Sequence, residues 1–105
     1  VHITGGGIPG KLGRVLGPVK LGADIVEPLD PPKVMLYCQK LGNVQDAEAY
    51  RTWNMGHAGI FITPEPDKVL DVARDGKVIG YVSERPGIRI TNRGYFASLQ
   101  RQLVF

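Results

Sequence analysis

A glycine-rich stretch near the start of the chain has residue types suited to holding a phosphate. Three consecutive glycines, Gly5, Gly6 and Gly7, let main-chain N–H groups converge on an anion without obstruction by side chains. Pro9 suits the start of a helical turn whose positive dipole end would face the anion, and Thr4 adds a hydroxyl. A simple tight turn is the alternative, because the stretch matches neither a Walker A loop nor a dinucleotide-binding fingerprint.

Two histidines have glycine neighbours, and an unperturbed imidazole exchanges protons near neutral pH. His2 comes just before the glycine stretch, where it acts either as an acid–base group or as a residue that orients the loop by hydrogen bonding. We take His2 as the candidate catalytic residue. His57, between Gly56 and Ala58, is expected at a backbone turn with an exposed imidazole.

Residues 50–56 form a second candidate stretch, with aromatic, cationic and amide side chains at one helix end. Arg51 can pair with a carboxylate or phosphate in a two-pronged geometry, and Asn54 can donate to and accept from an amide-like substrate. Both are candidate cleft-lining residues. In the structural alternative, Tyr50 and Trp53 anchor the core and Asn54 takes the left-handed conformation of a helix exit.

The sequence predicts no metal site. Cys38, the only cysteine, is expected to be a small buried hydrophobe on the apolar face of its helix. Asp67, Asp71 and Asp75 recur at four-residue spacing, which a solvated helix face explains without a metal.

Composition and charge restrict the class of protein. The 105 residues, 43% of them hydrophobic, can form one core, so we predict a single domain over residues 1–105. The net charge of +3 arises from 13 basic residues interleaved with 10 acidic ones. This scattered charge would attract a phosphorylated small molecule as well as a nucleic acid, so we expect no nucleic-acid partner. The arginines near the end are interpreted as a solvated surface: Arg85, Arg89, Arg93 and Arg101.

No apolar run approaches the roughly 20 residues that span a bilayer, and no segment resembles a signal peptide. We therefore expect no membrane partner and a cytoplasmic location.

Glycines and prolines divide the chain into short elements. Strands are predicted over residues 23–26, 59–63, 78–82 and 88–91, with residues 1–3 as a strand end and residues 96–105 as a strand or a loose tail. Helices are predicted over residues 9–16, over residues 31–41 after an Asp30 cap, from Asp46 to near Trp53, and from Pro66 until Gly76. The side chains expected to face a core are Val34, Cys38 and Leu41 in the second helix and Val69, Leu70, Val72 and Ala73 in the last. Strands and helices do not alternate regularly along the chain, which indicates an α+β fold. We expect a mixed sheet of about four strands with helices packed on it.

Four segments, in order and spacing, resemble the C-terminal domain of the aminoimidazole ribonucleotide (AIR) synthetase family. They are residues 2–7 (HITGGG), 14–16 (RVL), 42–44 (GNV) and 50–56 (YRTWNMG). The resemblance extends to about Thr91. The sequence departs from the family's usual pattern at residues 10–13, Trp53 and Met55. These departures leave open a paralogous enzyme that uses ATP on another substrate. Such paralogues include enzymes of selenophosphate, thiamine phosphate and hydrogenase-maturation chemistry.

The resemblance implies an ATP-dependent cyclo-ligase of purine biosynthesis, which converts formylglycinamidine ribonucleotide to AIR. It implies that ATP and magnesium bind mainly to an N-terminal domain absent from these residues, and that the full-length enzyme is a homodimer. Val1 begins inside an expected strand without an initiating methionine, so we expect the first strand and helix of the fold to be absent too, and this portion alone to be inactive. The substrate phosphate is then expected at Thr4, Gly5, Gly6 and Gly7. A stand-alone binding or regulatory module for a phosphorylated metabolite remains the alternative.

Overall fold

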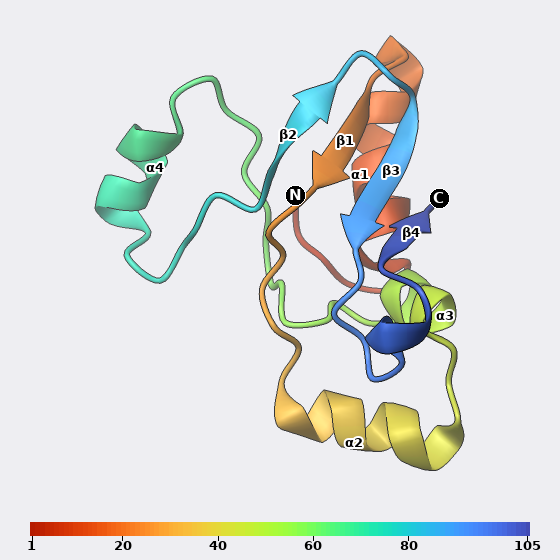
Figure 1. Ribbon diagram of the computed structural model, residues 1–105. Coiled ribbons are helices and arrows are strands. Elements are labelled where there is room, and N and C mark those ends of the chain that lie inside the picture. Colours follow the sequence, from red (N-terminus) through yellow and green to blue (C-terminus); the bar gives the residue numbers. More distant parts are fainter.

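The computed structural model describes all 105 residues, which form four α-helices and a four-stranded sheet (Figure 1). The helices are α1 (Gly7–Leu16), α2 (Lys33–Gly42), α3 (Asp46–Thr52) and α4 (Pro66–Val72), with short 3₁₀ turns at Gly17–Val19 and Ala97–Leu99. The strands are β1 (Gly22–Ile25), β2 (Gly80–Ser83), β3 (Gly87–Thr91) and β4 (Gln102–Val104). None of the helices has the length and apolar character that crossing a bilayer demands.

The sheet is mixed, with strand order β2-β1-β3-β4. The central strands β1 and β3 pair in parallel, and the edge strands β2 and β4 pair antiparallel to them. Parallel neighbours need a long crossover, and here the crossover contains α2, α3 and α4. The predicted α+β class with a mixed sheet of about four strands is confirmed, and the tail forms strand β4.

Helix α1 covers one face of the sheet, behind β1 and β3 in Figure 1. Its buried residues Ile8, Leu12 and Leu16 recur at helical spacing, so they form one stripe. The facing strand residues alternate in the sequence and are buried as well: Ala23, Ile25, Ile88, Ile90 and Leu103. Tyr50 and Met55 complete this core from the third helix and the turn after it.

Arg89 holds β1 and β3 together on the opposite face of the sheet. Its Nε donates to Asp24 Oδ1 at 2.6 Å and its Nη2 donates to Asp24 Oδ2 at 3.2 Å. The guanidinium also donates to the carbonyl oxygens of Pro86 and Arg85, so this buried charge is fully partnered. The hydrogen bond and the charge of Arg89 hold the pKa of Asp24 below its usual range. The interpretation of Arg89 as a solvated surface residue is therefore wrong.

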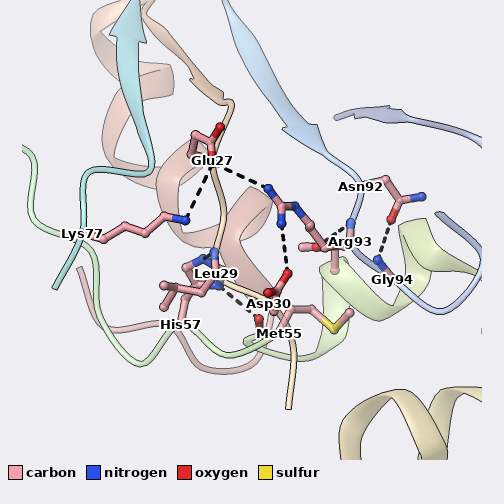
Figure 2. Close-up of polar contacts among 10 residues, drawn as sticks. Glu27, Leu29, Asp30, Met55, His57, Lys77, Asn92, Arg93 and Gly94 are labelled. Carbon is pink, nitrogen blue, oxygen red and sulfur yellow. Dashed lines mark hydrogen bonds and ion pairs between the residues drawn. The ribbon is translucent and has the colours of Figure 1, made fainter. Parts of the chain in front are cut away.

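A buried carboxylate, Asp46, ties the C-terminal loop to α2 and α3. Its Oδ1 accepts from Gln39 Nε2 and from the Phe96 amide, and its Oδ2 accepts from Asn92 Nδ2 at 2.8 Å. Gln39 Oε1 accepts from the Tyr95 amide at 2.9 Å, and Asn92 Oδ1 accepts from the Gly94 amide (Figure 2). We call Gln39, Asp46 and Asn92 the buried polar cluster. Because all three side chains have partners, the cluster fixes the loop without leaving an unsatisfied group.

The buried polar cluster explains an error in the predicted orientation of α2. Val34 is 69% exposed and Leu41 68% exposed, and Cys38 is exposed too, although the sequence pattern predicted that all three face a core. Gln39 is the buried residue of this helix, so it turns the opposite face inward. The helix also starts at Lys33 and not at Pro31, because a residue that precedes proline disfavours the α conformation. Asp30 is therefore not the cap.

The segment between α3 and β2 departs furthest from the predicted structure. Residues 59–63 form no strand, and only an isolated bridge joins Gly59 to His2. Helix α4 ends at Val72, before Gly76, and stands away from the sheet (Figure 1). Val72 is 85% exposed, so its predicted core position is wrong, whereas Val69, Leu70 and Ala73 are half-buried.

Replacing Asp46 with asparagine is expected to lower the free energy of unfolding by about 2 to 3 kcal/mol. The asparagine side chain has one acceptor oxygen, whereas both carboxylate oxygens of Asp46 accept hydrogen bonds. The NH₂ group that replaces the other oxygen would face a hydrogen-bond donor, so buried polar groups would be left without partners. Urea unfolding measures the change. Asp71→Asn makes the same chemical change on an exposed residue and is expected to stay within about 0.5 kcal/mol of the parent. Equal stability of the two variants would contradict a role for the cluster.

Candidate phosphate-binding site

The glycine loop, residues 4–7, lies at the N-terminus of α1 with Thr4, Gly5 and Gly6 exposed. Gly6 has a φ of 97° and Gly7 a φ of 62°, in the left-handed region that side chains disfavour. Gly6 is the N-cap residue of α1, and no acidic side chain lies in the first turn. The local sequence thus produces an exposed, sharply turned helix entry that carries no negative charge.

Several main-chain N–H groups of this loop have no acceptor in the protein. The Gly7 amide donates to the Thr4 carbonyl at 2.9 Å and the Gly10 amide donates to the Gly6 carbonyl at 3.0 Å, but the amides of Gly5, Gly6 and Ile8 make no such bond. Free amides at a helix N-terminus are suited to bind an anion, since the helix dipole adds to their partial charges. The exposed amides of Gly5 and Gly6 are therefore suited to an anion, whereas Ile8 is buried, and the assignment of a phosphate to this loop stays a prediction.

The loop rests on the C-terminal end of α3. A Cβ atom on Gly7 would collide with the carbonyl oxygen of Tyr50 and lie only 3.0 Å from that of Trp53. The two stretches singled out in the sequence are therefore in contact through their backbones. By contrast, no atom lies within 4 Å of a Cβ placed on Gly5, so this residue borders open space.

His2 is exposed, and its imidazole makes no hydrogen bond within the protein. His2 lies two residues before the loop begins, and its backbone pairs with that of Gly59. Lys11 and Arg14 follow on α1, half-buried and exposed respectively, and supply positive charge near the loop. The catalytic assignment of His2 stays a prediction.

The predicted cleft-lining residues have structural partners. The Arg51 guanidinium lies 5.2 Å from the ring centroid of Phe105, a cation–π contact with the C-terminus. Asn54 Oδ1 accepts from the Gly56 amide at 2.9 Å, and the left-handed residue beside it is Met55, with a φ of 50°. The structural alternative, in which Asn54 takes that conformation, is wrong, and its side chain stabilises the turn instead. Their assignment to a cleft stays a prediction.

The aromatic residues of the same stretch anchor the core, as the structural alternative predicted. Tyr50 is fully buried and Trp53 packs half-buried against the core. The Tyr50 hydroxyl accepts from the Arg93 amide at 3.2 Å, and burial raises the pKa of Tyr50 to about 12. This phenol therefore stays protonated at neutral pH.

His57 is buried, with 2% of its surface exposed, so the predicted exposed imidazole is wrong. Its Nε2 accepts from the Leu29 amide at 3.0 Å, and its Nδ1 lies 3.2 Å from the carbonyl oxygens of both Asn54 and Met55 (Figure 2). These contacts select the tautomer with the proton on Nδ1. Burial lowers the pKa of His57 below its ordinary value, which favours the neutral ring. The adjacent residue, Gly56, has a φ of 94°, a conformation that favours glycine. The glycine at this position is the signal in the sequence that the turn is tight.

Ion pairs beside His57 connect the segment after β1 to the segment after β3 (Figure 2). Arg93 lies 3.0 Å from Asp30 and 3.6 Å from Glu27, and Lys77 lies 3.8 Å from Glu27. These pairs are largely exposed, so each contributes little to stability. They orient the chain around the buried histidine without forming a reactive centre.

Comparison with known proteins identifies the family. The model of the family described as AIR synthase related protein, C-terminal domain, matches residues 1–92. The chain belongs to this family. The resemblance inferred from the glycine loop and the 50–56 stretch is thereby confirmed.

Relatives of this AIR synthase related domain carry the name phosphoribosylformylglycinamidine cyclo-ligase. The protein from Methanosarcina barkeri (strain Fusaro / DSM 804) is 44% identical over 91 residues, which cover 85% of this chain and 26% of the relative. The protein from Methanopyrus kandleri is 35% identical over 103 residues, 93% of this chain and 29% of the relative. The chain thus spans about a quarter of the length of the curated relatives it matches.

The stability of the AIR synthase related domain is expected to fall below pH 6.5. Because burial lowers the pKa of His57 from 6.5, the unfolded chain binds more protons than the folded one at mildly acidic pH. The contribution of His57 is complete above pH 6.5 and decreases as the pH falls, with a slope of up to about 1.4 kcal/mol per pH unit. Urea unfolding between pH 7.5 and pH 5, roughly above the range in which Asp24 titrates, measures this slope.

The control is His57→Gln, whose Oε1 can still accept from the Leu29 amide but does not titrate. In this variant the free energy of unfolding is expected to lose its pH dependence in this range. His2→Gln changes an exposed ring and is expected to keep that dependence. A slope that persists in His57→Gln would assign the effect to another group.

Proposed function

We propose that this domain is the C-terminal portion of an ATP-dependent cyclo-ligase that converts formylglycinamidine ribonucleotide to AIR in purine biosynthesis. Membership of the AIR synthase related family and the names of the relatives support the reaction. The observation that carries the role of this chain is the glycine loop, with its unpaired amides at the start of a ten-residue helix. The loop binds the phosphate group of the ribonucleotide substrate.

The phosphate role follows from charge and access. A phosphate monoester is a dianion near neutral pH, and the exposed residues Gly5 and Gly6 offer N–H donors that have no acceptor in the protein. The dipole of α1 adds to these donors, and Lys11 contributes a positive charge one turn further on. Thr4, exposed at the same turn, adds a hydroxyl. Binding here would orient the rest of the substrate along the exposed side of residues 2–4.

Ring closure requires a proton acceptor. In the proposed reaction ATP supplies the phosphoryl group that turns the formyl amide oxygen into a leaving group. The substrate amine then forms the new C–N bond, phosphate departs, and a proton is lost from the nitrogen. His2 is exposed at the entrance to the loop with both ring nitrogens available, so it is our candidate for receiving that proton.

The remaining parts of the proposal concern the full-length enzyme. The structure brings no three His, Cys, Asp or Glu side chains together, and we assign no step to a metal here. ATP and magnesium would bind mainly to the N-terminal domain, which would also form the homodimer. This portion alone would be inactive, and the full-length enzyme cytoplasmic. If the natural gene product has only the mass of these 105 residues, the regulatory-module alternative replaces the cyclo-ligase.

Gly5→Val in the full-length enzyme is expected to raise KM for formylglycinamidine ribonucleotide by about tenfold or more, the loss of roughly 1.4 kcal/mol of binding. A branched side chain would stand beside the free amides, yet nothing lies within 4 Å of its Cβ and Gly5 is outside the left-handed region. It should therefore not disturb the fold, unlike Gly6→Val, which is strained at a φ of 97°. Steady-state kinetics with the ribonucleotide varied at saturating ATP measure the effect.

Gly13→Ala is the matched control, because Gly13 is an exposed helix glycine that also has nothing within 4 Å. We expect an unchanged KM for this variant. An unchanged KM in Gly5→Val as well would remove the loop from the substrate site.

His2→Asn in the full-length enzyme is expected to lower kcat by about 100-fold at nearly constant KM, the range typical of a lost acid–base group. The pH dependence of kcat should also lose its acidic limb, and added imidazole should partly restore the rate. A residue that only orients the loop would instead raise KM and would not respond to imidazole. Rate constants measured from pH 5.5 to 9 distinguish these outcomes.

A further inference from the structure

The C-terminal segment, residues 92–105, contacts α3 from the first turn of that helix to the last (Figure 1). At the start of α3, Asp46 Oδ2 accepts from the Asn92 side chain at 2.8 Å. One turn further on, the Tyr50 hydroxyl accepts from the Arg93 amide at 3.2 Å. Because a helix of seven residues is too short to be stable alone, contacts such as these determine where α3 lies.

The contact at the last turn of α3 is a cation–π pair. The guanidinium of Arg51 lies 5.2 Å from the ring centroid of Phe105. Phe105 is half-buried against the core, and its backbone exchanges two hydrogen bonds with Ile88 of β3, at 2.8 Å and 3.1 Å. Arg51 is exposed and forms no ion pair. The ring, fixed to a central strand, is therefore the partner that holds this charge.

The same turn of α3 supports the glycine loop. A Cβ atom on Gly7 would collide with the carbonyl oxygen of Tyr50 and would lie 3.0 Å from that of Trp53. These two residues enclose Arg51 in the sequence, so the turn that Phe105 holds through Arg51 is the turn on which Gly7 rests. A displacement of this turn would move the loop and its free amides.

We propose that Phe105 is a positioning residue for the phosphate site, which holds Arg51 and with it the last turn of α3 beneath the glycine loop. This inference rests on the proposed function in that the loop binds the phosphate of the substrate. Phe105 acts through Arg51 and is not a ligand of the substrate. It lies beyond residues 1–92, which the family model matches.

Phe105→Leu in the full-length enzyme tests the role, because leucine keeps an apolar contact with the core but has no π-face for a cation. We expect KM for formylglycinamidine ribonucleotide to rise about threefold, the effect of one exposed cation–π contact, with kcat and KM for ATP unchanged. Phe105→Tyr keeps the ring and is expected to keep the parent KM. Steady-state kinetics with each substrate varied in turn measure these values. An unchanged KM for the ribonucleotide, or an equal rise for ATP, would overturn the proposal.

Leu103→Val is the matched control for a merely structural effect. Leu103 lies two residues before Phe105 on the same face of the sheet, is 2% exposed and belongs to the core. The loss of a buried methylene group is expected to lower the free energy of unfolding and to leave KM unchanged. If KM rises as much in Leu103→Val as in Phe105→Leu, stability explains both, and Phe105 has no positioning role.

Arg51→Gln shows whether the ring acts through the guanidinium. In this background Phe105→Leu is expected to cause no further rise in KM, because the charge that the ring holds is already gone. If the two substitutions multiply each other's effect on KM, Phe105 acts by another route, and the proposal is wrong.

A measurement without substrate separates this inference from the proposed function. The Trp53 amide donates to the Ala49 carbonyl at 2.8 Å and closes the last turn of α3. In the full-length enzyme we expect this amide to exchange hydrogen about threefold faster in Phe105→Leu and at the parent rate in Leu103→Val.

Two results then have different meanings. If exchange at Trp53 is faster but KM is unchanged in both Phe105→Leu and Gly5→Val, the proposed phosphate site is wrong, and the hold of Phe105 on α3 stands. If Gly5→Val raises KM but Phe105→Leu changes neither exchange nor KM, only the role of Phe105 is refuted.

Discussion

The close approach of the Gly7 backbone to the carbonyl oxygen of Tyr50 is the constraint on which the candidate site depends. Any side chain at position 7 would collide with that carbonyl, and the backbone takes a left-handed conformation there. Tyr50 is itself fully buried, so the loop is positioned by the core and not by its own flexibility. The neighbouring Gly5 and Gly6 remain exposed, with their amides pointing to no protein acceptor. One glycine thus serves packing, and the other two leave the surface open to an anion.

The turn that follows α3 supports this arrangement from the other side. His57 is held in one tautomer between Leu29 and the carbonyls of Asn54 and Met55, which fixes the chain just before its bridge to His2. The buried polar cluster around Asp46 performs a similar task for the C-terminal loop. Both use buried polar groups whose hydrogen bonds are complete, so each determines one local conformation.

The sequence by itself determined the local features whose causes lie within a few residues. The glycine loop, the start of α1 near Pro9, the alternating apolar residues of β1 and β3, and the family resemblance were all predictable, because backbone freedom and side-chain periodicity are local properties. Only the tertiary structure decided which polar residues are buried. Gln39, His57 and Arg89 each have a hydrogen-bond partner far along the chain, 56, 28 and 65 residues away respectively. No pattern along the chain brings Arg89 to Asp24 or His57 to Leu29. The same reason explains the two largest errors. Val34 and Leu41 are exposed because Gln39 is drawn inward, and residues 59–63 form no strand because a strand requires a partner, which these 105 residues provide only as far as Ile60.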